Sequence, residues 1–204
     1  AYLNLAGQPD LLIKVSNGSG GEAEIEYTPS TAYSNYLPNK TGKLPFAVPA
    51  ASKITLKDGR GNSYSTTYFY KDNSFDAKNR EFRGFAYAKV TDAEGNFTEN
   101  YFKQDSIYKG RLSKQEFKDK NGNLYSKIEN TWKYTEAYPG VYFVYLSSSD
   151  NFIYDGDSTY KQTQTKFAYD NYGNTTKVIY YGDVDIVEDD KTQITEYSYN
   201  TSDG

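Results

Sequence analysis

Tyr169-Asp170-Asn171-Tyr172-Gly173-Asn174 is the stretch that decides the fold. The carboxylate of Asp170 can accept a hydrogen bond from the backbone N–H two residues on, and Gly173 supplies the positive φ that ends the turn. The core of this stretch, Asp-x-x-Gly-Asn, occurs three more times, and each copy predicts the tight end of a β-hairpin. The other copies comprise Asp58, Gly61 and Asn62, then Asp92, Gly95 and Asn96, then Asp119, Gly122 and Asn123.

The segments between these turns are rich in Tyr, Phe, Thr, Ile and Val, which favour β-strands. The turn aspartates at 58, 92, 119 and 170 are separated by 34, 27 and 51 residues. Such spacings allow strands of about ten residues, roughly 33 Å long, which suit a sheet that curves around something. The sequence therefore predicts an all-β fold in which long antiparallel hairpins form one or two curved sheets.

The composition indicates an ordered structure with a thin core. Leu, Ile, Val and Phe make up roughly 19% of the 204 residues, and the net charge is only -4. The 23 Tyr make up for the missing aliphatic content, because each can bury its ring and keep its hydroxyl at a polar partner.

Two absences exclude most enzyme classes. The chain has no Cys, which excludes disulfides and thiolate metal sites, and no His, which removes the commonest general base and metal ligand. We therefore expect no enzymatic activity, no cofactor and no metal. The mild acidity argues against a nucleic-acid partner, and no apolar run approaches the length of a membrane span.

We expect residues 1–204 to be one all-β fragment of a larger protein. Residues 1–50 are interpreted as a leading hairpin followed by a Pro-rich excursion, and residues 51–204 as the series of hairpins. The last strand is expected over Thr192–Tyr199. Because it carries few charges and no Pro, it is the strand that we most expect to be exposed at an edge, and we expect weak self-association through this strand or the first.

The string Arg80-Glu81-Phe82-Arg83-Gly84-Phe85 carries a family resemblance. Together with Leu44-Pro45-Phe46 and with Asp10-Leu11-Leu12 near the start, it resembles the B component of bacterial insecticidal toxin complexes. The matching region of that family lies between a β-propeller and a shell of YD (Rhs) repeats. The stretch at Tyr169 fits the YD-repeat pattern in full, whereas the other three copies fit only its turn.

The resemblance implies a function as well as a fold. In that family, YD-repeat strands spiral into a hollow shell that encloses a toxin or effector polypeptide. This chain would then be a non-catalytic segment of the shell wall, in a secreted or cell-surface bacterial protein. Its partners would be the rest of the same polypeptide and the other chains of the toxin complex.

Several alternatives remain open from the residues alone. Arg80, Phe82, Arg83 and Phe85 can form an ordinary strand with a salt-bridged rim, or a contact site for a partner chain. The aromatic residues within 132–146 can be packing residues or a sugar-binding platform, as in a carbohydrate-binding or adhesive module. Asp155-Gly156-Asp157 favours a solvated turn over a weak calcium site, because the spacing of an EF-hand is lacking.

Overall fold

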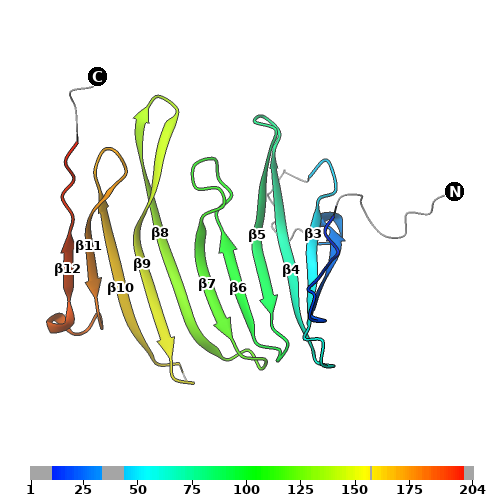
Figure 1. Ribbon diagram of the computed structural model, residues 1–204. Helices are drawn as coiled ribbons and strands as arrows, with labels where there is room; N and C mark the ends of the chain where they lie inside the picture. The colour runs from blue at the N-terminus through cyan, green and yellow to red at the C-terminus, as the bar shows by residue number, and fades with distance from the viewer. Residues whose placement is uncertain (1–10, 34–43, 157, 200–204) are drawn as a thin grey trace.

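The computed structural model describes residues 11–33, 44–156 and 158–199. These residues form one open sheet in which every strand is antiparallel to its neighbours and the strand order follows the chain (Figure 1). The predicted all-β fold of antiparallel hairpins is confirmed, as a single curved sheet. Its strands are β1 (Lys14–Ser16), β2 (Glu22–Pro29), β3 (Pro49–Lys57), β4 (Ser63–Asp76), β5 (Glu81–Thr91), β6 (Phe97–Phe102), β7 (Leu112–Lys118), β8 (Leu124–Tyr138), β9 (Val141–Tyr154), β10 (Tyr160–Tyr169), β11 (Thr175–Tyr181) and β12 (Lys191–Ile194).

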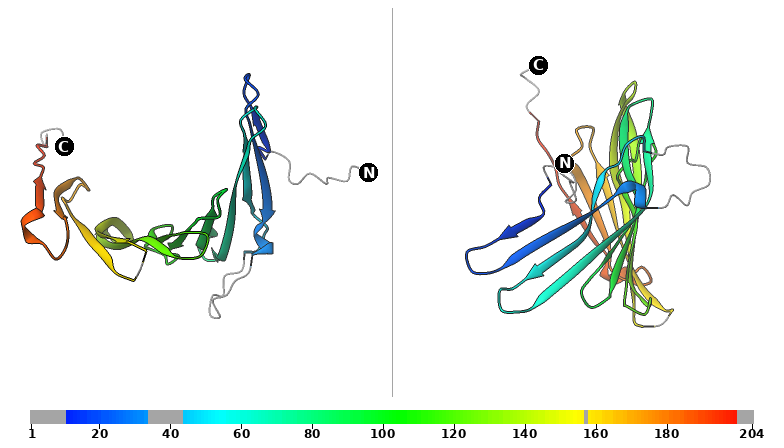
Figure 2. Two further views of the ribbon diagram at one scale, coloured as in Figure 1. Left: turned by 90° about the horizontal axis from the view of Figure 1, so that it is seen from below. Right: turned by 90° about the vertical axis from the view of Figure 1, so that its right-hand side faces the viewer.

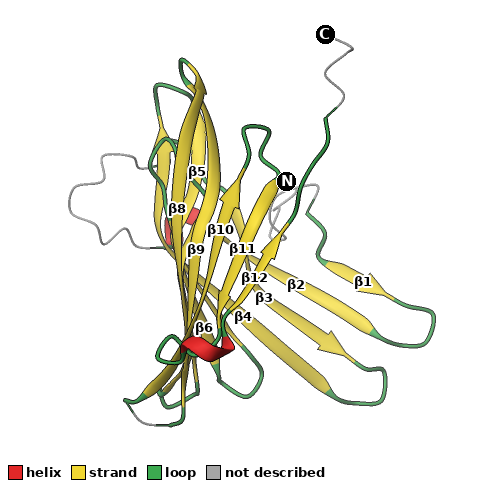
Figure 3. Ribbon diagram, turned by 90° about the vertical axis from the view of Figure 1, so that its left-hand side faces the viewer, coloured by secondary structure: helices red, strands yellow, loops and turns green. Residues whose placement is uncertain are grey.

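The sheet is bent into a trough. Seen from below, its two ends rise toward the same side and leave the middle strands at the bottom of a U (Figure 2). The helices of the described chain are two short 3-10 turns, η1 (Ser30–Ala32) and η2 (Val187–Asp189), and neither covers a face of the sheet (Figure 3). None of these described helices is long and apolar enough to cross a membrane.

One face of the sheet is charged. The strand register aligns side chains in rows across neighbouring strands, and one row runs Lys89, Glu99, Glu116, Lys127 and Phe152 from β5 to β9. Lysines and carboxylates continue on this side to the first strand. We call this side the charged face, and it carries Lys14, Glu22, Glu24, Glu26, Lys53, Lys57, Lys71, Lys89, Glu99, Lys114, Glu116, Lys118, Lys127, Glu129 and Asp150.

The opposite side carries apolar residues together with neutral polar ones such as Asn100, Gln115 and Asn151. In β2 its apolar residues alternate with the acidic residues of the charged face. One row of paired residues crosses the middle of this side, from Tyr68 through Val90, Thr98, Phe117 and Ser126 to Ile153. We call it the apolar face. It also carries Ile25, Ile54, Leu56, Ile128, Trp132, Val144 and Leu146.

The apolar face lies on the inside of the curve. In the β5–β6 hairpin the N–H of Asp92 donates to the carbonyl of Asn96 at 2.9 Å. Hydrogen-bonded pairs alternate along a ladder, so Thr98 and Asn100 also bond to β5. In Figure 1, β6 runs upward and β5 is its right-hand neighbour. Because the residues are L-amino acids, a residue of such a strand that hydrogen-bonds to the right points its side chain toward the viewer. The side chains of Thr98 and Asn100 therefore point toward the viewer. That is the side toward which both ends of the sheet curve, so the charged face is convex.

The sheet has almost no core of its own. Phe152 is the one buried apolar residue among those described. The accessible surface is 13987 Å², whereas a compact monomer of 23.2 kDa exposes roughly 9,700 Å². The single layer therefore leaves much more of its surface exposed than a compact domain of the same mass.

Both ends of the sheet differ in detail from the sequence-based expectation. The strand expected over Thr192–Tyr199 ends at Ile194, although Thr195 still donates to the carbonyl of Thr176 at 2.9 Å and keeps the chain beside β11. The Pro-rich excursion closes where Pro29 of β2 pairs with Pro49 of β3, and residues 34–43 within it lie outside the described residues. Residues 1–10, before β1, also lie outside them.

Candidate functional site

The four Asp-x-x-Gly-Asn turns share one geometry, which we call the Asp–Asn clasp. In the turn at Asp170, one carboxylate oxygen accepts the N–H groups of Tyr172 and Asn174, both at 2.9 Å. The amide of Asn174 donates to the other oxygen at 3.2 Å, and Gly173 has a φ of +89°. The same Asp–Asn contacts recur at Asp58, Asp92 and Asp119. The glycines Gly61, Gly95 and Gly122 also have positive φ.

The clasps lie in turns at both ends of the strands, not all on one side of the sheet. Because the strands follow one another in order, turns after odd-numbered strands share one end and turns after even-numbered strands share the other. The clasps at Asp58, Asp92 and Asp119 follow β3, β5 and β7, whereas the clasp at Asp170 follows β10 and lies at the opposite end (Figure 1).

Hydrogen bonding lowers the pKa of each clasp carboxyl. At Asp58 the amide of Asn62 is the main cause, with the N–H of Arg60 next. At Asp92, Asp119 and Asp170, burial by itself would raise the pKa. The hydrogen bonds outweigh burial in all three, so the net direction of the pKa is down. The clasps therefore hold their aspartates in the charged form.

A fifth turn of this kind, which the sequence motif did not identify, connects β4 to β5. Asp76 accepts the N–H of Lys78 at 3.0 Å, and the amide of Asn79 donates to its other oxygen at 2.7 Å. Asn79 stands where the other turns have Gly, and the positive φ falls one residue later, at Arg80, with a value of +53°. The Asp-x-x-Asn spacing was the available signal, but the missing Gly concealed it.

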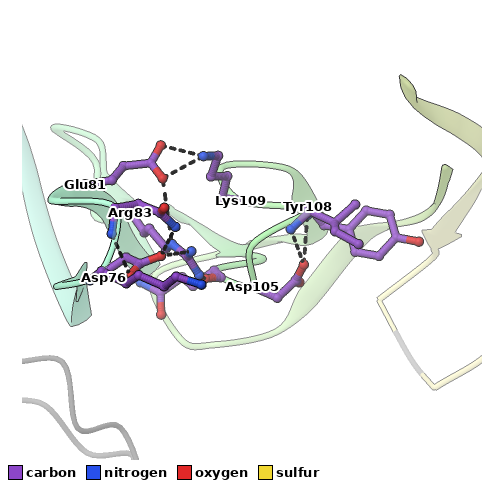
Figure 4. Close-up of polar contacts among 10 residues, drawn as sticks. Asp76, Glu81, Arg83, Asp105, Tyr108 and Lys109 are labelled. Carbon is purple, nitrogen blue, oxygen red and sulfur yellow. Dashed lines mark hydrogen bonds and ion pairs between the residues drawn. The ribbon is translucent and has the colours of Figure 1, made fainter. Parts of the chain in front are cut away.

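A polar clamp is built on this turn (Figure 4). The guanidinium of Arg83 donates to the carboxylate of Asp76, and both side chains are mostly buried. Arg83 also donates to the backbone carbonyl of Gln104 at 3.1 Å. The amide of Gln104, which is only 7% exposed, donates to the carbonyls of Asp72 at 2.8 Å and Gly84 at 3.0 Å. These contacts join the β4–β5 hairpin to the connection between β6 and β7.

That connection, residues 103–111, is held on both sides, and we call it the strap. Toward β5, Lys109 contacts both carboxylate oxygens of Glu81 at 2.6 Å (Figure 4). Toward β8, Tyr108 packs edge-on against Tyr134 at 5.9 Å, and Arg111 lies over the ring of Trp132 at 5.0 Å. The strap therefore ties β4 and β5 to β8 above the shorter strands β6 and β7.

Phe82 and Phe85 belong to an aromatic cluster beside the clamp. Two residues of one strand separated by three positions should point to opposite faces, but their rings are 5.9 Å apart. The register explains this: Phe75 pairs with Phe82 and Asn73 pairs with Phe85, so β5 carries one extra residue. Gly84, with a φ of +76°, lies in this bulge. The cluster continues through Tyr70 and Tyr33.

The charged face has its tightest cluster at the centre of the sheet. Glu99 and Glu116 lie opposite each other, and Lys118 contacts them at 2.6 and 2.9 Å. Burial would lower the pKa of Lys118, but its hydrogen bonds to Glu116 and Glu99 prevail and raise it. Burial and a hydrogen bond to Glu99 raise the pKa of the Tyr87 hydroxyl. The cluster is a closed set of paired charges with no poised acid or base.

The structure places the residues considered as a partner contact in different settings. Arg83, Phe82 and Phe85 are engaged within the chain, by the clamp and the aromatic cluster. Arg80 is exposed at the turn. Asp157 of the acidic turn lies outside the described residues, and no group of acidic metal ligands gathers in the part of the chain that is described.

A family model provides an independent comparison. The model of the insecticide toxin TcdB middle/N-terminal region matches residues 2–116. The match covers more than half of the chain and includes the clamp and the strap. Among curated proteins, no sequence matches the chain.

Solved structures show the same fold. The crystal structure of TcdB2-TccC3 without its hypervariable C-terminal region is 19% identical, with a TM-score of 0.67 over 93% of this chain and 12% of that one. The Photorhabdus luminescens Tc holotoxin pore is 18% identical, with a TM-score of 0.68 over 83% of this chain and 12% of that one. The chain therefore spans about 12% of the length of these structures.

Proposed function

The chain belongs to the family of the insecticide toxin TcdB middle/N-terminal region, and from this premise we propose that it is a non-catalytic segment of a shell wall in a toxin complex. The shell, built of YD repeats, would enclose a toxin or effector polypeptide. The parent protein would be secreted or displayed at the surface of a bacterium. Its partners would be the rest of the same polypeptide and the other chains of the complex.

One observation carries the proposal: the chain is a curved single layer with two open edges. β1 and β12 each have one paired neighbour, and among the described residues Phe152 alone is a buried apolar residue. Such a layer cannot satisfy its own edges or cover its own apolar face. It gains both when neighbouring strands continue the sheet and other material fills the trough.

The difference between the two faces supports a wall with an inside and an outside. The convex face is covered with paired charges, which are compatible with water. The concave face exposes large apolar side chains, among them Leu56 at 53%, Tyr64 at 55% and Ile153 at 54%. A polypeptide held inside the trough would contact this apolar surface, because apolar surface is stabilised when it is removed from water.

A pair of cysteine substitutions tests which face meets the enclosed polypeptide. The chain has no native Cys, so an introduced thiol is unique within it. Ser126 lies on the apolar face of β8, and Thr131 lies on the charged face of the same strand. In the complete toxin complex, Ser126→Cys should resist a bulky maleimide and crosslink to the enclosed polypeptide, whereas Thr131→Cys should label fully. Equal labelling at both positions, or crosslinking only from Thr131→Cys, would contradict the proposal.

Absence of catalysis is part of the same proposal. No His or Cys occurs in the chain, and the central carboxylates of the charged face are already paired with lysines. We expect no turnover of glycoside, ester or peptide substrates by this region. Activity that disappears when a single Asp or Glu of the chain is replaced would refute a purely structural role.

A further inference from the structure

A cavity of about 830 Å³ lies where two hairpin ends approach each other. One is the projecting end of the β8–β9 hairpin, and the other is the Asp170 clasp between β10 and β11; they lie side by side in Figure 1. Its lining comprises Lys133, Thr135, Glu136, Ala137, Tyr138, Phe143, Tyr145, Ser147, Phe167, Ala168, Tyr169, Asp170, Asn171 and Tyr172. A shell wall does not require this cavity.

Aromatic rings line one side of the cavity. The rings of Phe143 and Tyr145 are stacked, with centroids 5.6 Å apart and planes at 24°. Tyr169 packs against both, at 6.0 and 5.2 Å. The aromatic strip of residues 132–146 is therefore divided by the strand alternation: two of its other tyrosines, Tyr134 and Tyr142, pack together at 5.3 Å on the opposite face.

Two further rings stand at the rim and are largely exposed. Tyr138 is 74% exposed and Tyr172 is 69% exposed. Tyr172 is held in place because its ring packs against Tyr199 at 4.5 Å. The turn below it is fixed by the Asp170 clasp and by the close approach of Gly173 to the ring of Phe143. The site is therefore formed without a ligand.

The charges of the cavity are mostly occupied. Glu136 accepts the N–H of Gly140 at 2.8 Å. Both carboxylate oxygens of Asp170 accept hydrogen bonds from its own turn, and one also accepts from Tyr199. The groups left to meet a ligand are the neutral hydroxyls of Thr135 and Ser147, the amide of Asn171 and one ammonium, that of Lys133.

We propose that this cavity binds a saccharide. Aromatic faces cover the apolar C–H face of a sugar ring, and hydroxyl and amide groups can pair with its hydroxyls. A cationic ligand would have to compete with the hydrogen bonds that the carboxylates of Glu136 and Asp170 already accept, and a nucleotide would need more than one cation for its phosphates. The volume lies within the range of small-molecule sites. The site is separate from the apolar face that is proposed to contact an enclosed polypeptide.

The test is glycan-array screening of the full-length protein that contains this chain, followed by titration calorimetry with the best saccharide. Tyr138→Ala and Tyr172→Ala remove only rim rings, so the sheet should fold normally, which hydrogen exchange of β8–β11 checks. Each should weaken binding about tenfold or more. Tyr64→Ala removes another exposed ring, which is 55% exposed and far from the cavity, and should leave affinity unchanged.

Each other result overturns the proposal. Failure of every saccharide to bind at millimolar concentration would overturn it. Binding that survives both rim substitutions would also overturn it. Competition by a mononucleotide or by a tyrosine-rich peptide at the same rim residues would assign the cavity to a different ligand. The shell proposal is tested by labelling of the complete complex, so the two can fail separately.

Discussion

Gly122 and Gly173 offer a matched pair for measuring what a turn glycine contributes. Both end an Asp–Asn clasp, and their φ values are +91° and +89°. A Cβ added at Gly122 meets nothing within 4 Å, whereas one added at Gly173 lies 3.0 Å from a ring carbon of Phe143. Gly122→Ala therefore tests backbone strain alone, and Gly173→Ala tests strain plus a steric contact.

The expected costs follow from these two terms. Positive φ in a non-Gly residue costs about 1 kcal/mol or somewhat more, so Gly122→Ala should lower the free energy of unfolding by roughly that amount. Gly173→Ala adds overpacking against Phe143, which is held by Tyr145 and Tyr169, and such overpacking costs about 1–3 kcal/mol. The difference between the two variants should therefore be at least about 1 kcal/mol.

Urea denaturation of the parent, the two variants and the same variants in a Phe143→Leu background measures this difference as a double-mutant cycle. Phe143→Leu leaves more room for the new methyl group, so the Gly173→Ala penalty should fall toward that of Gly122→Ala. The Gly122→Ala penalty should not change in that background. Equal penalties for the two alanine variants, or a Gly173→Ala penalty that is the same in both backgrounds, would refute the steric part of the reasoning.

Four further outcomes are expected. Lys118→Met should cost about 1–3 kcal/mol because it removes the lysine partner of Glu99 and leaves Glu116 paired with Lys114 alone, whereas Lys120→Met should cost under about 0.5 kcal/mol; urea denaturation separates them. Arg83→Met should speed hydrogen exchange across the strap, whereas the exposed Arg80→Ala should not. Because the clasp aspartates have lowered pKa values, their stabilisation is present above about pH 4 and is lost as the pH falls through the folded-state values; Asp119→Asn should reduce that acid sensitivity in thermal melts. Ile194→Pro should suppress edge-to-edge association in sedimentation experiments. The N–H of Thr195 points inward and bonds to Thr176, and the direction of the N–H groups alternates along a strand, so the N–H of Ile194 points outward, where a second chain would pair.

The turns show how far a short motif can be interpreted. Asp and Gly have local roles, acceptor and positive φ, and both could be assigned from the sequence. The role of the Asn was not apparent, because its amide bonds back across the turn to the Asp carboxylate. The turn at Asp76 was missed for the opposite reason: Arg80 adopts positive φ without being Gly.

The clamp could not be predicted, because it depends on contacts between distant parts of the chain. Gln104 bonds to Asp72 and Gly84, which lie 32 and 20 residues away. A polar residue in a loop gives no local sign that it will be buried. In the same way, Lys118 and Lys120 look alike in sequence, but the strand register places only Lys118 between two carboxylates.

The sheet is held together by links between neighbouring strands, and this bears on how the chain behaves within a wall. Among the described residues, each strand makes most of its contacts with the strands next to it in the chain, so its stability depends mainly on local pairs, as in a repeat array. The strap is an exception, because it ties β4 and β5 to β8 across two intervening strands. It therefore resists flattening of the sheet at the centre of the trough. Because the apolar face lies on the inside of that bend, the contacts of the strap would keep this face turned toward the material that fills the trough. This effect would not depend on whether neighbouring strands pair with β1 and β12.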